Sequence, residues 1–145
     1  MMNLEFNSLK PVKYIFYILL LIVTSCKEPK PPQVTFDVPA LIGKNIDEVR
    51  KVLGKPLENP PDPSNSKEEH YDNIYKKDGQ TLLISYNLNN RKISSFFIVS
   101  STDYDNVKDL MKIGNLDSLQ TMNYSAEAEH PYFTDSFNSI KITLR

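Results

Sequence analysis

Residues 71–86, YDNIYKKDGQTLLISY, place the dipeptide Asp78-Gly79 between two runs of residues that favour β-strands. An Asp-Gly pair in this position is a strong signal for a tight β-hairpin. We therefore expect antiparallel strands over residues 71–76 and 81–86. A second turn over residues 87–91 leads into KISSFFIVS, residues 92–100, so the sequence predicts a three-strand antiparallel meander.

The meander carries more apolar residues than one face of a sheet can hold. Residues 82–84 and 96–99 are apolar at consecutive positions, so apolar side chains point to both faces. Strands of this kind are buried on both faces, or they leave an apolar patch exposed. The residues expected on the face that helices cover are Tyr71, Leu83, Ile93, Phe97 and Val99.

A short helix is predicted ahead of the meander, over residues 46–53. Asn45 can accept hydrogen bonds from N–H groups of the first turn while Glu48 reaches back, an arrangement known as a capping box. Gly54 and Pro56 end the helix. Two turns do not persist alone, so the apolar stripe must pack on the sheet. The stripe consists of Ile46, Val49, Val52 and Leu53.

The sequence after the meander predicts a second helix and a further strand. Asp103 is the expected N-cap and Gly114 the end of a helix with an apolar stripe. Residues 139–145, SIKITLR, alternate apolar and polar positions and predict a strand, whereas residues 124–129 fit either a short strand or a helical turn. The predicted fold class is α+β, with an antiparallel sheet of about four strands covered by two short helices. The stripe of the second helix is Tyr104, Val107, Leu110 and Met111.

The N-terminal residues indicate where the protein is sent. Residues 14–26, YIFYILLLIVTSC, contain nine consecutive apolar residues and follow Lys10 and Lys13. A basic region, a short apolar run and small residues at its end are typical of a secretory signal peptide. A membrane-spanning helix needs about 20 apolar residues, so this run is too short to remain as one. We expect residues 1–25 to be a signal peptide.

The end of that run resembles the lipobox of bacterial lipoproteins. Val23, Thr24 and Ser25 supply an aliphatic and two small residues ahead of Cys26, the only cysteine of the chain. The resemblance implies that the Cys26 thiol receives a diacylglyceryl group, that the signal is cut before Cys26, and that the new amino terminus is acylated. Several acyl chains, such as palmitate, hold a protein on a membrane where one chain would not. A secreted protein with a stray thiol and a cytosolic protein with an apolar first helix are the alternatives.

The predicted mature chain divides into a tether and one domain. Residues 26–39, CKEPKPPQVTFDVP, contain four prolines among charged residues and predict an extended tether beyond the lipidated Cys26. Lys27 and Glu28 resemble the charged tags that direct some lipoproteins to the outer membrane or the cell surface, although a solvated linker without an address fits equally well. Residues 40–145 are expected to form a single domain.

Charge argues against a nucleic-acid partner. The whole chain has 17 basic and 18 acidic residues, and removing residues 1–25 takes away two lysines and one glutamate, which leaves 15 and 17. A mature chain with a net charge of about −2 offers no basic field for nucleic acid. The expected partners are the membrane, through the lipid on Cys26, and other proteins of the envelope.

Residues 42–56, IGKNIDEVRKVLGKP, are similar to the opening helix of small outer-membrane lipoproteins of the SmpA/OmlA type, which accompany β-barrel assembly. The similarity covers about 15 residues. Wall-binding PASTA repeats have a comparable lead into a helix, which residues 38–43, VPALIG, resemble. A PASTA repeat would be followed by a repeating module, and no repeat follows here. Both similarities are local.

The sequence offers little support for catalysis. Its two histidines, His70 and His130, lie in no metal-binding or nucleophilic motif, and Ser94 and Ser95 lie in no Gly-x-Ser-x-Gly elbow. A zinc site built from the two histidines and two carboxylates is conceivable on paper. The local polar cluster that could hold an acid and a base consists of Glu127, Glu129, His130 and Asp135. We expect no enzyme, no catalytic residue, no metal site and no cofactor.

Three function classes remain open. The first is a non-enzymatic, lipid-anchored envelope protein that binds another protein through an exposed apolar patch. The second is a binding module for a small molecule or glycan, with a pocket lined by Tyr71, Tyr75 and Tyr86. The third is a small hydrolase, for which a histidine must lie within hydrogen-bond reach of a carboxylate in a cleft.

Overall fold

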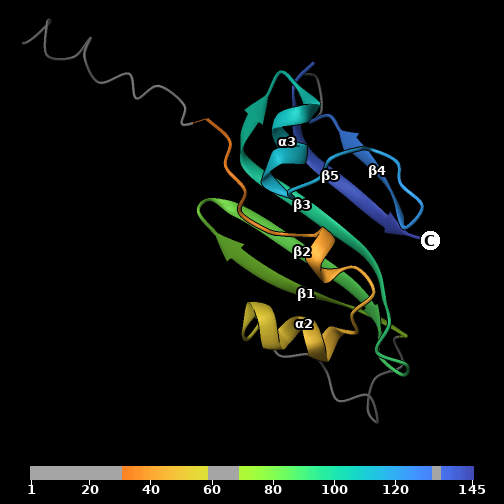
Figure 1. The fold of residues 1–145 in the computed structure, drawn as a ribbon. Coiled ribbons are helices and arrows are strands. Elements are labelled where there is room, and N and C mark those ends of the chain that lie inside the picture. The colour runs from red at the N-terminus through yellow and green to blue at the C-terminus, as the bar shows by residue number, and fades with distance from the viewer. Residues whose placement is uncertain (1–30, 59–68, 132–134) are drawn as a thin grey trace, which may run out of the picture. The chain divides into compact units, whose positions relative to one another are not determined.

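The computed structural model describes residues 31–58, 69–131 and 135–145, and residues 32–145 form one compact unit. The α+β class is confirmed (Figure 1). The elements in chain order are the 3-10 turn η1 (Pro39–Leu41), helix α2 (Ile46–Leu53), strands β1 (His70–Lys77), β2 (Gln80–Asn87) and β3 (Ile93–Tyr104), helix α3 (Val107–Ile113), and strands β4 (Tyr124–Glu129) and β5 (Phe137–Leu144).

The five strands form a single antiparallel sheet in the order β1-β2-β3-β5-β4. The meander β1-β2-β3 and the C-terminal strand are confirmed, but the sheet has five strands where about four were expected. The additional strand is β4, which pairs with β5 from Tyr124 opposite Leu144 to Glu129 opposite Ser139. Its own sequence, YSAEAE, is too short and too poor in β-branched residues to exclude a helical turn. The partner strand decides its conformation.

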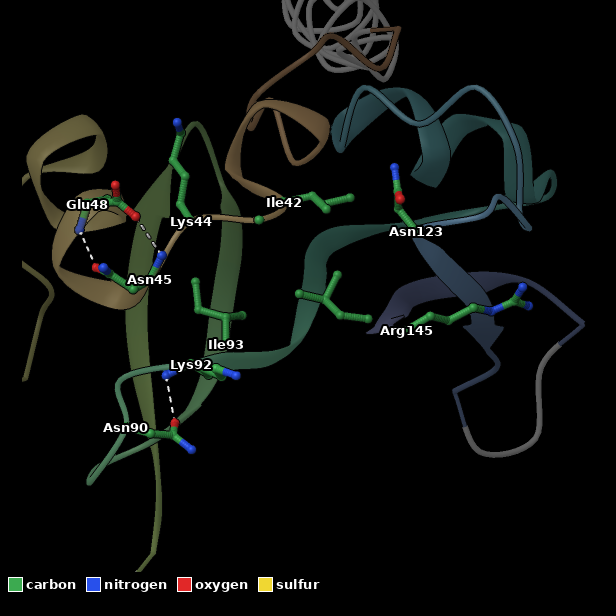
Figure 2. A pocket seen from close by; sticks show the side chains of 11 residues that line it. Ile42, Lys44, Asn45, Glu48, Asn90, Lys92, Ile93, Asn123 and Arg145 are labelled. Atoms are coloured by element: carbon green, nitrogen blue, oxygen red, sulfur yellow. Dashed lines mark hydrogen bonds between the residues drawn. The ribbon is translucent and has the colours of Figure 1, made fainter.

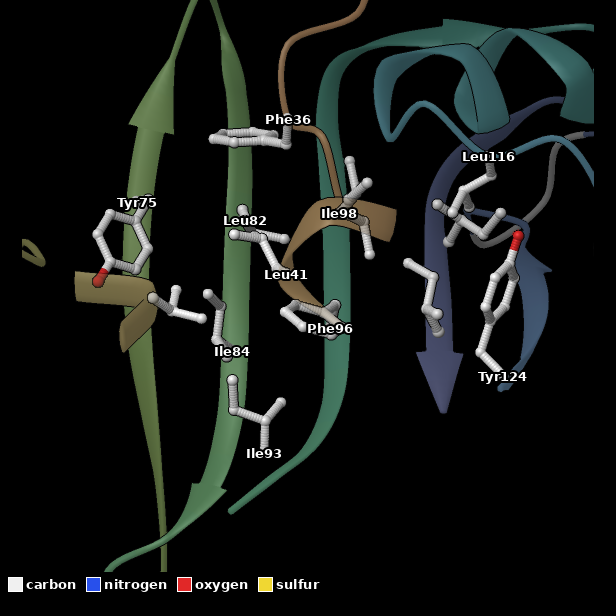
Figure 3. Close-up of a cluster of buried hydrophobic side chains, with 14 of the residues drawn as sticks. Phe36, Leu41, Tyr75, Leu82, Ile84, Ile93, Phe96, Ile98, Leu116 and Tyr124 are labelled. Carbon is white, nitrogen blue, oxygen red and sulfur yellow. The ribbon is translucent and has the colours of Figure 1, made fainter. Parts of the chain in front are cut away.

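One face of the sheet holds the core (Figure 3). Leu82 and Ile84 of β2 and Phe96 and Ile98 of β3 are completely buried there, and Leu41 of η1 packs over them. Buried residues of both helices join the same cluster, namely Ile46 and Val49 of α2 and Leu110, Met111 and Ile113 of α3.

The expected inward face of the meander was wrong for three of its five residues. Tyr71 and Ile93 do lie on the core face, whereas Leu83, Phe97 and Val99 lie on the opposite one. The cause is a bulge in the pairing of β2 with β3. Ser85 pairs with Ser95 but Tyr86 pairs with Ile93, so one additional residue of β3 brings Ile93 and Phe96 onto the same face. Strict alternation from Ile93 therefore selected the wrong set of residues.

Helix α2 confirms the predicted start and end. The Asn45 side chain accepts hydrogen bonds from the backbone N–H groups of Asp47 and Glu48, and the Glu48 carboxylate accepts from the Asn45 N–H at 2.9 Å. Gly54 follows with a positive φ of 85°. Val52 was wrongly placed on the buried stripe, because it is 62% exposed. At 100° per residue, Val52 lies beyond the edge of the stripe that Ile46 and Val49 define.

The second helix starts later than expected. Its N-cap is Asn106, whose side chain accepts from the Lys108 N–H, and not Asp103. Asp103 and Tyr104 belong to β3, and Tyr104 pairs with Phe137 of β5. Pairing with β5 therefore extends β3 over Asp103 and Tyr104, which the helical spacing had assigned to the second helix.

The domain begins before residue 40, which corrects the C-terminal limit of the expected tether. Phe36 and Val38 are buried in the core. The backbone N–H groups of Thr35 and Phe36 donate to the Ile113 carbonyl, and that of Val38 donates to the Gly114 carbonyl. Prolines dominate the composition of residues 26–39, yet two apolar residues at alternate positions suffice to bind the segment to the end of α3. Residues 26–30 of the expected tether lie outside the described residues.

Candidate functional site

A cluster of polar side chains lies between α2 and the sheet. The guanidinium of Arg50 donates through Nη2 to Oδ1 of Asn73 at 3.2 Å and to the hydroxyl of Tyr86 at 3.0 Å. Asn73 and Tyr86 have no exposed surface. A charged donor to two buried acceptors holds α2 at a fixed position on β1 and β2.

A second arginine completes this cluster from the turn between β2 and β3. Arg91 donates through Nε and Nη2 to the two carboxylate oxygens of Asp47, at 3.1 and 2.6 Å. The Arg91 hydrogen bond lowers the pKa of Asp47, and Arg50, 3.3 Å from the same carboxylate, lowers it further. Both guanidinium groups also lie over the Tyr86 ring, at 5.5 Å for Arg50 and 5.2 Å for Arg91. The cluster therefore joins the first turn of α2 to the meander.

Three atoms of this cluster have no hydrogen-bond partner in the described structure: Nε of Arg50, Nδ2 of Asn73 and the hydroxyl of Tyr75. Burial raises the pKa of Tyr75, and the nearby Asn73 and Arg50 oppose that rise. Neither residue forms a hydrogen bond with the Tyr75 hydroxyl. Sequence reasoning did not find this cluster. The available signal was Asn73, a polar residue two positions from both Tyr71 and Tyr75. Side chains two positions apart in a strand share a face, so Asn73 lies on the same inward face as the two tyrosines.

The three tyrosines proposed to line a ligand pocket are together on the core face. The rings of Tyr71 and Tyr86 meet edge to face, with centroids 6.1 Å apart. Tyr86 and Tyr75 are buried, so their rings contribute to the core. These residues therefore do not form a surface strip of stacked tyrosines.

A hollow of about 540 Å³ opens between the start of α2, the turn between β2 and β3, and the end of β5 (Figure 2). Ile42, Ile93 and Leu144 supply apolar side chains to it. Three cations, Lys44, Lys92 and Arg145, also line it, but Figure 2 shows their side chains spread around the rim and not converging on one point. Glu48 is the only carboxylate side chain among the lining residues, and it is engaged in the capping box.

The face of the sheet opposite the core carries an apolar patch that we call the outer sheet face: Ile74, Leu83, Phe97 and Val99. Leu83 of β2 pairs with Ile74 of β1 on one side and with Phe97 of β3 on the other. Val99 follows two residues after Phe97 and therefore shares its face. All four side chains are half-buried, while Lys76 and Lys141 on the same face are exposed. The described helices α2 and α3 pack on the opposite, core face.

Among the described residues, no hydrogen bond joins His130 to a carboxylate of the predicted acid–base cluster. His130 is exposed, its Nδ1 lies 3.2 Å from the Ser136 carbonyl, and its ring lies 4.2 Å from that of Phe137. Neither contact involves a carboxylate. Glu127 and Glu129 lie on β4, paired with Lys141 and Ser139. Asp135 is exposed in the segment before β5.

His70 lies elsewhere, at the start of β1. It is exposed and shares a shallow hollow with Glu58, Asp72, Ser94 and Ser95. The Asp72 carboxylate accepts from Ser85 Oγ at 2.5 Å, and Ser94 Oγ donates to the Ser85 carbonyl. In the described part of the chain His70 has no hydrogen bond to a carboxylate, so the pairing that a hydrolase requires is not formed there.

Among residues 31–58, 69–131 and 135–145, no helix is both long and apolar enough to cross a membrane. The described residues also hold no group of three or more His, Cys, Asp or Glu side chains arranged to bind a metal ion. Cys26 and residues 23–25 lie outside the described residues, and lipid attachment there stays a prediction.

Comparison with known proteins gives no family. No protein-family model and no curated protein matches the sequence. Among solved structures, the fold is similar to a cysteine-rich secretory protein from Staphylococcus aureus subsp. aureus Mu50, with a TM-score of 0.47 and 11% sequence identity. The similarity covers 77% of this chain and 46% of that protein, so the chain spans less than half the length of this neighbour.

Proposed function

We propose that this protein is a non-enzymatic lipoprotein of the bacterial envelope, anchored by lipid at Cys26, whose α+β domain binds another protein. The outer sheet face is the observation that supports binding most strongly. Leu83 and Phe97 lie side by side on β2 and β3, with Ile74 next to Leu83 on β1 and Val99 two residues along β3 from Phe97. Contiguous apolar surface rimmed by charged side chains is typical of protein–protein contact sites.

The anchor is supported by the sequence of the leader. A basic start, nine apolar residues and the run Val23-Thr24-Ser25 ahead of Cys26 all fit a lipoprotein precursor. The outer membrane is the membrane that we propose, since Lys27 and Glu28 after the cysteine resemble the charged tags of lipoproteins sent there or to the cell surface.

Site-specific photo-crosslinking in intact cells tests the binding surface. A photoreactive amino acid at position 97 should yield one adduct of defined mass. The same group at position 122 should not, because Met122 is 92% exposed but lies in the loop before β4. Leu83→Asp should abolish the adduct at position 97 while circular dichroism stays unchanged. The absence of any specific adduct at position 97 would contradict the proposed interaction.

Mass spectrometry tests the anchor separately. The purified protein should begin at Cys26 and carry the mass of its acyl chains, and Cys26→Ala should leave the membrane fraction. An intact leader with an unmodified thiol would reject the lipoprotein assignment, whatever the crosslinking shows.

The hollow of Figure 2 supports a second candidate, the binding of a small molecule. Its apolar residues and basic rim suit an amphipathic anion, because apolar contact and charge then act on different parts of one ligand. A panel of fatty acids and acidic glycans should raise the melting temperature, and Lys44→Glu with Lys92→Glu should remove that effect while the control Lys141→Glu should not. No shift with any member of the panel would dismiss this candidate.

A further inference from the structure

The chain enters the described domain beside a hollow at the edge of β1. Figure 1 shows residues 32–36 running past the turn between β1 and β2, and Thr35 and Phe36 line this hollow. The other walls come from the end of α2, from the segment that follows it, and from β1. Three segments distant in sequence therefore meet where the predicted tether joins the domain.

Exposed apolar side chains gather at this place. Val34 is 51% exposed, Val52 62% and Leu57 61%. Val52 and Leu57 both line the hollow, and Val34 directly precedes Thr35. Among the described residues, the other exposed large hydrophobic side chains are Leu119, at 36%, and Met122, at 92%. The exposure is therefore concentrated and not scattered over the surface.

The same place is basic. Lys55, Lys76 and Lys77 line the hollow, and its lining includes no carboxylate. Glu58 and Asp78 are the acidic residues that follow Leu57 and Lys77 in sequence, at the margin of this region. We call Val34, Val52, Leu57, Lys55, Lys76 and Lys77 the tether-side face. It combines apolar side chains with positive charge on a chain whose predicted mature form is net negative.

The length of the predicted tether limits which part of the domain meets the membrane. Eight residue-to-residue steps lead from Cys26 to Val34. Fully extended, they reach about 28 Å. A domain of about 110 residues has a diameter of roughly 35 Å. Because the tether is shorter than the domain is wide, the side of the domain opposite Val34 cannot turn toward the bilayer.

We propose that the tether-side face lies against the anionic surface of the membrane that holds the lipid of Cys26. The lysines are attracted to acidic headgroups, and the three apolar side chains enter the boundary between headgroups and acyl chains. This inference rests on the lipid anchor of the proposed function. It adds that the domain has a fixed side toward the bilayer and does not tumble on a passive tether.

Tryptophan quenching tests the orientation, since the chain contains no tryptophan of its own. The lipidated protein is reconstituted into vesicles that contain phosphatidylglycerol and brominated lipids. Val52→Trp should be quenched at least twofold more than Met122→Trp, its exposed control. Replacing Lys55, Lys76 and Lys77 by glutamine, or adding 0.5 M salt, should reduce that difference, because salt screens charge over about 10 Å or less. Equal quenching at positions 52 and 122 would overturn the inference.

A second arm separates this inference from the anchor. The chain of residues 26–145 with Cys26→Ser retains the compact unit of residues 32–145 but carries no lipid. It should co-sediment with phosphatidylglycerol vesicles and, at least threefold less, with phosphatidylcholine vesicles. Co-sedimentation together with an unmodified Cys26 in cells would reject the anchor but retain the face. A lipidated Cys26 without preference for acidic vesicles would reject the face alone.

Discussion

Two buried tyrosines beneath α2 differ in how their hydroxyl groups are satisfied. The Tyr86 hydroxyl accepts a hydrogen bond from Arg50 at 3.0 Å, and the Tyr75 hydroxyl has no partner in the described structure. A buried polar atom without a partner destabilises the folded state by about 1–3 kcal/mol, whereas a hydrogen bond to a charged group contributes about 1.5–3 kcal/mol. The same deletion of one oxygen should therefore act in opposite directions at the two positions.

Tyr86→Phe should lower the free energy of unfolding by about 1.5 kcal/mol, because Arg50 loses one of its two buried acceptors. Tyr75→Phe should leave the free energy unchanged or raise it by up to about 1 kcal/mol, because it removes an unpaired hydroxyl. Urea unfolding followed by circular dichroism measures both. Equal losses for the two variants would contradict this difference and would mean that the Tyr75 hydroxyl is hydrogen-bonded in the folded protein.

Asp47 makes the stability depend on pH at the acid side. Its folded pKa lies below the ordinary value of 3.8, chiefly through the Arg91 hydrogen bond. A lowered pKa means that the unfolded chain binds the proton more readily, so the contribution is complete well above pH 3.8 and disappears as the pH falls through the folded pKa. Because the side chain is 52% exposed, the contribution is at most about 1 kcal/mol. Asp47→Asn should flatten the loss of stability below about pH 4, and an unchanged slope would exclude this role.

At the level of single elements, the sequence predicted what local interactions determine. The capping box of Asn45 and Glu48 and the Gly54 exit were predicted correctly, because each depends on a few neighbouring residues. Asp103 and Val52 were misplaced, because tertiary contacts decide them. Strand pairing extends β3 through Asp103, and the narrow contact of a two-turn helix leaves Val52 in solvent.

Val49 and Val52 of α2 provide a matched pair for this distinction. Val49→Ala should lower the free energy of unfolding by about 2 kcal/mol, because Val49 is completely buried and leaves a cavity. Val52→Ala should change it by less than about 0.5 kcal/mol, because the side chain is 62% exposed and alanine favours helix. Thermal unfolding compares the two, and similar losses would place Val52 on the buried stripe after all.

The arrangement of the whole molecule was only partly predictable. The Asp78-Gly79 turn specifies the first hairpin. In β2 and β3, however, consecutive positions are apolar, so the bulge at Ser85 and Tyr86 decides which face of the sheet becomes the core face. Those apolar runs predicted either burial on both faces or an exposed apolar patch, and they did not identify the residues of the outer sheet face. The polar cluster around Arg50 joins residues 23 and 36 positions apart in sequence, and no local pattern reports such contacts. The tether-side face could not be predicted for the same reason, because three segments distant in sequence form it.

Only the tertiary structure shows where the folded unit begins, and truncation tests this boundary. A chain that starts at Pro32 keeps Phe36 and Val38 in the core and should unfold cooperatively with the stability of the full-length protein. A chain that starts at Ala40 loses both side chains and the three backbone hydrogen bonds to the end of α3, at Ile113 and Gly114. Burial of a phenylalanine alone accounts for about 3–5 kcal/mol, and whole domains are stable by only about 5–15 kcal/mol. The shorter chain should therefore be largely unfolded at 37 °C.

Phe36→Ala in the longer chain should lower the unfolding free energy by about 3 kcal/mol, which separates loss of packing from the effect of a new terminus. A cooperative transition of unchanged midpoint for the chain from Ala40 would return residues 35–39 to the tether.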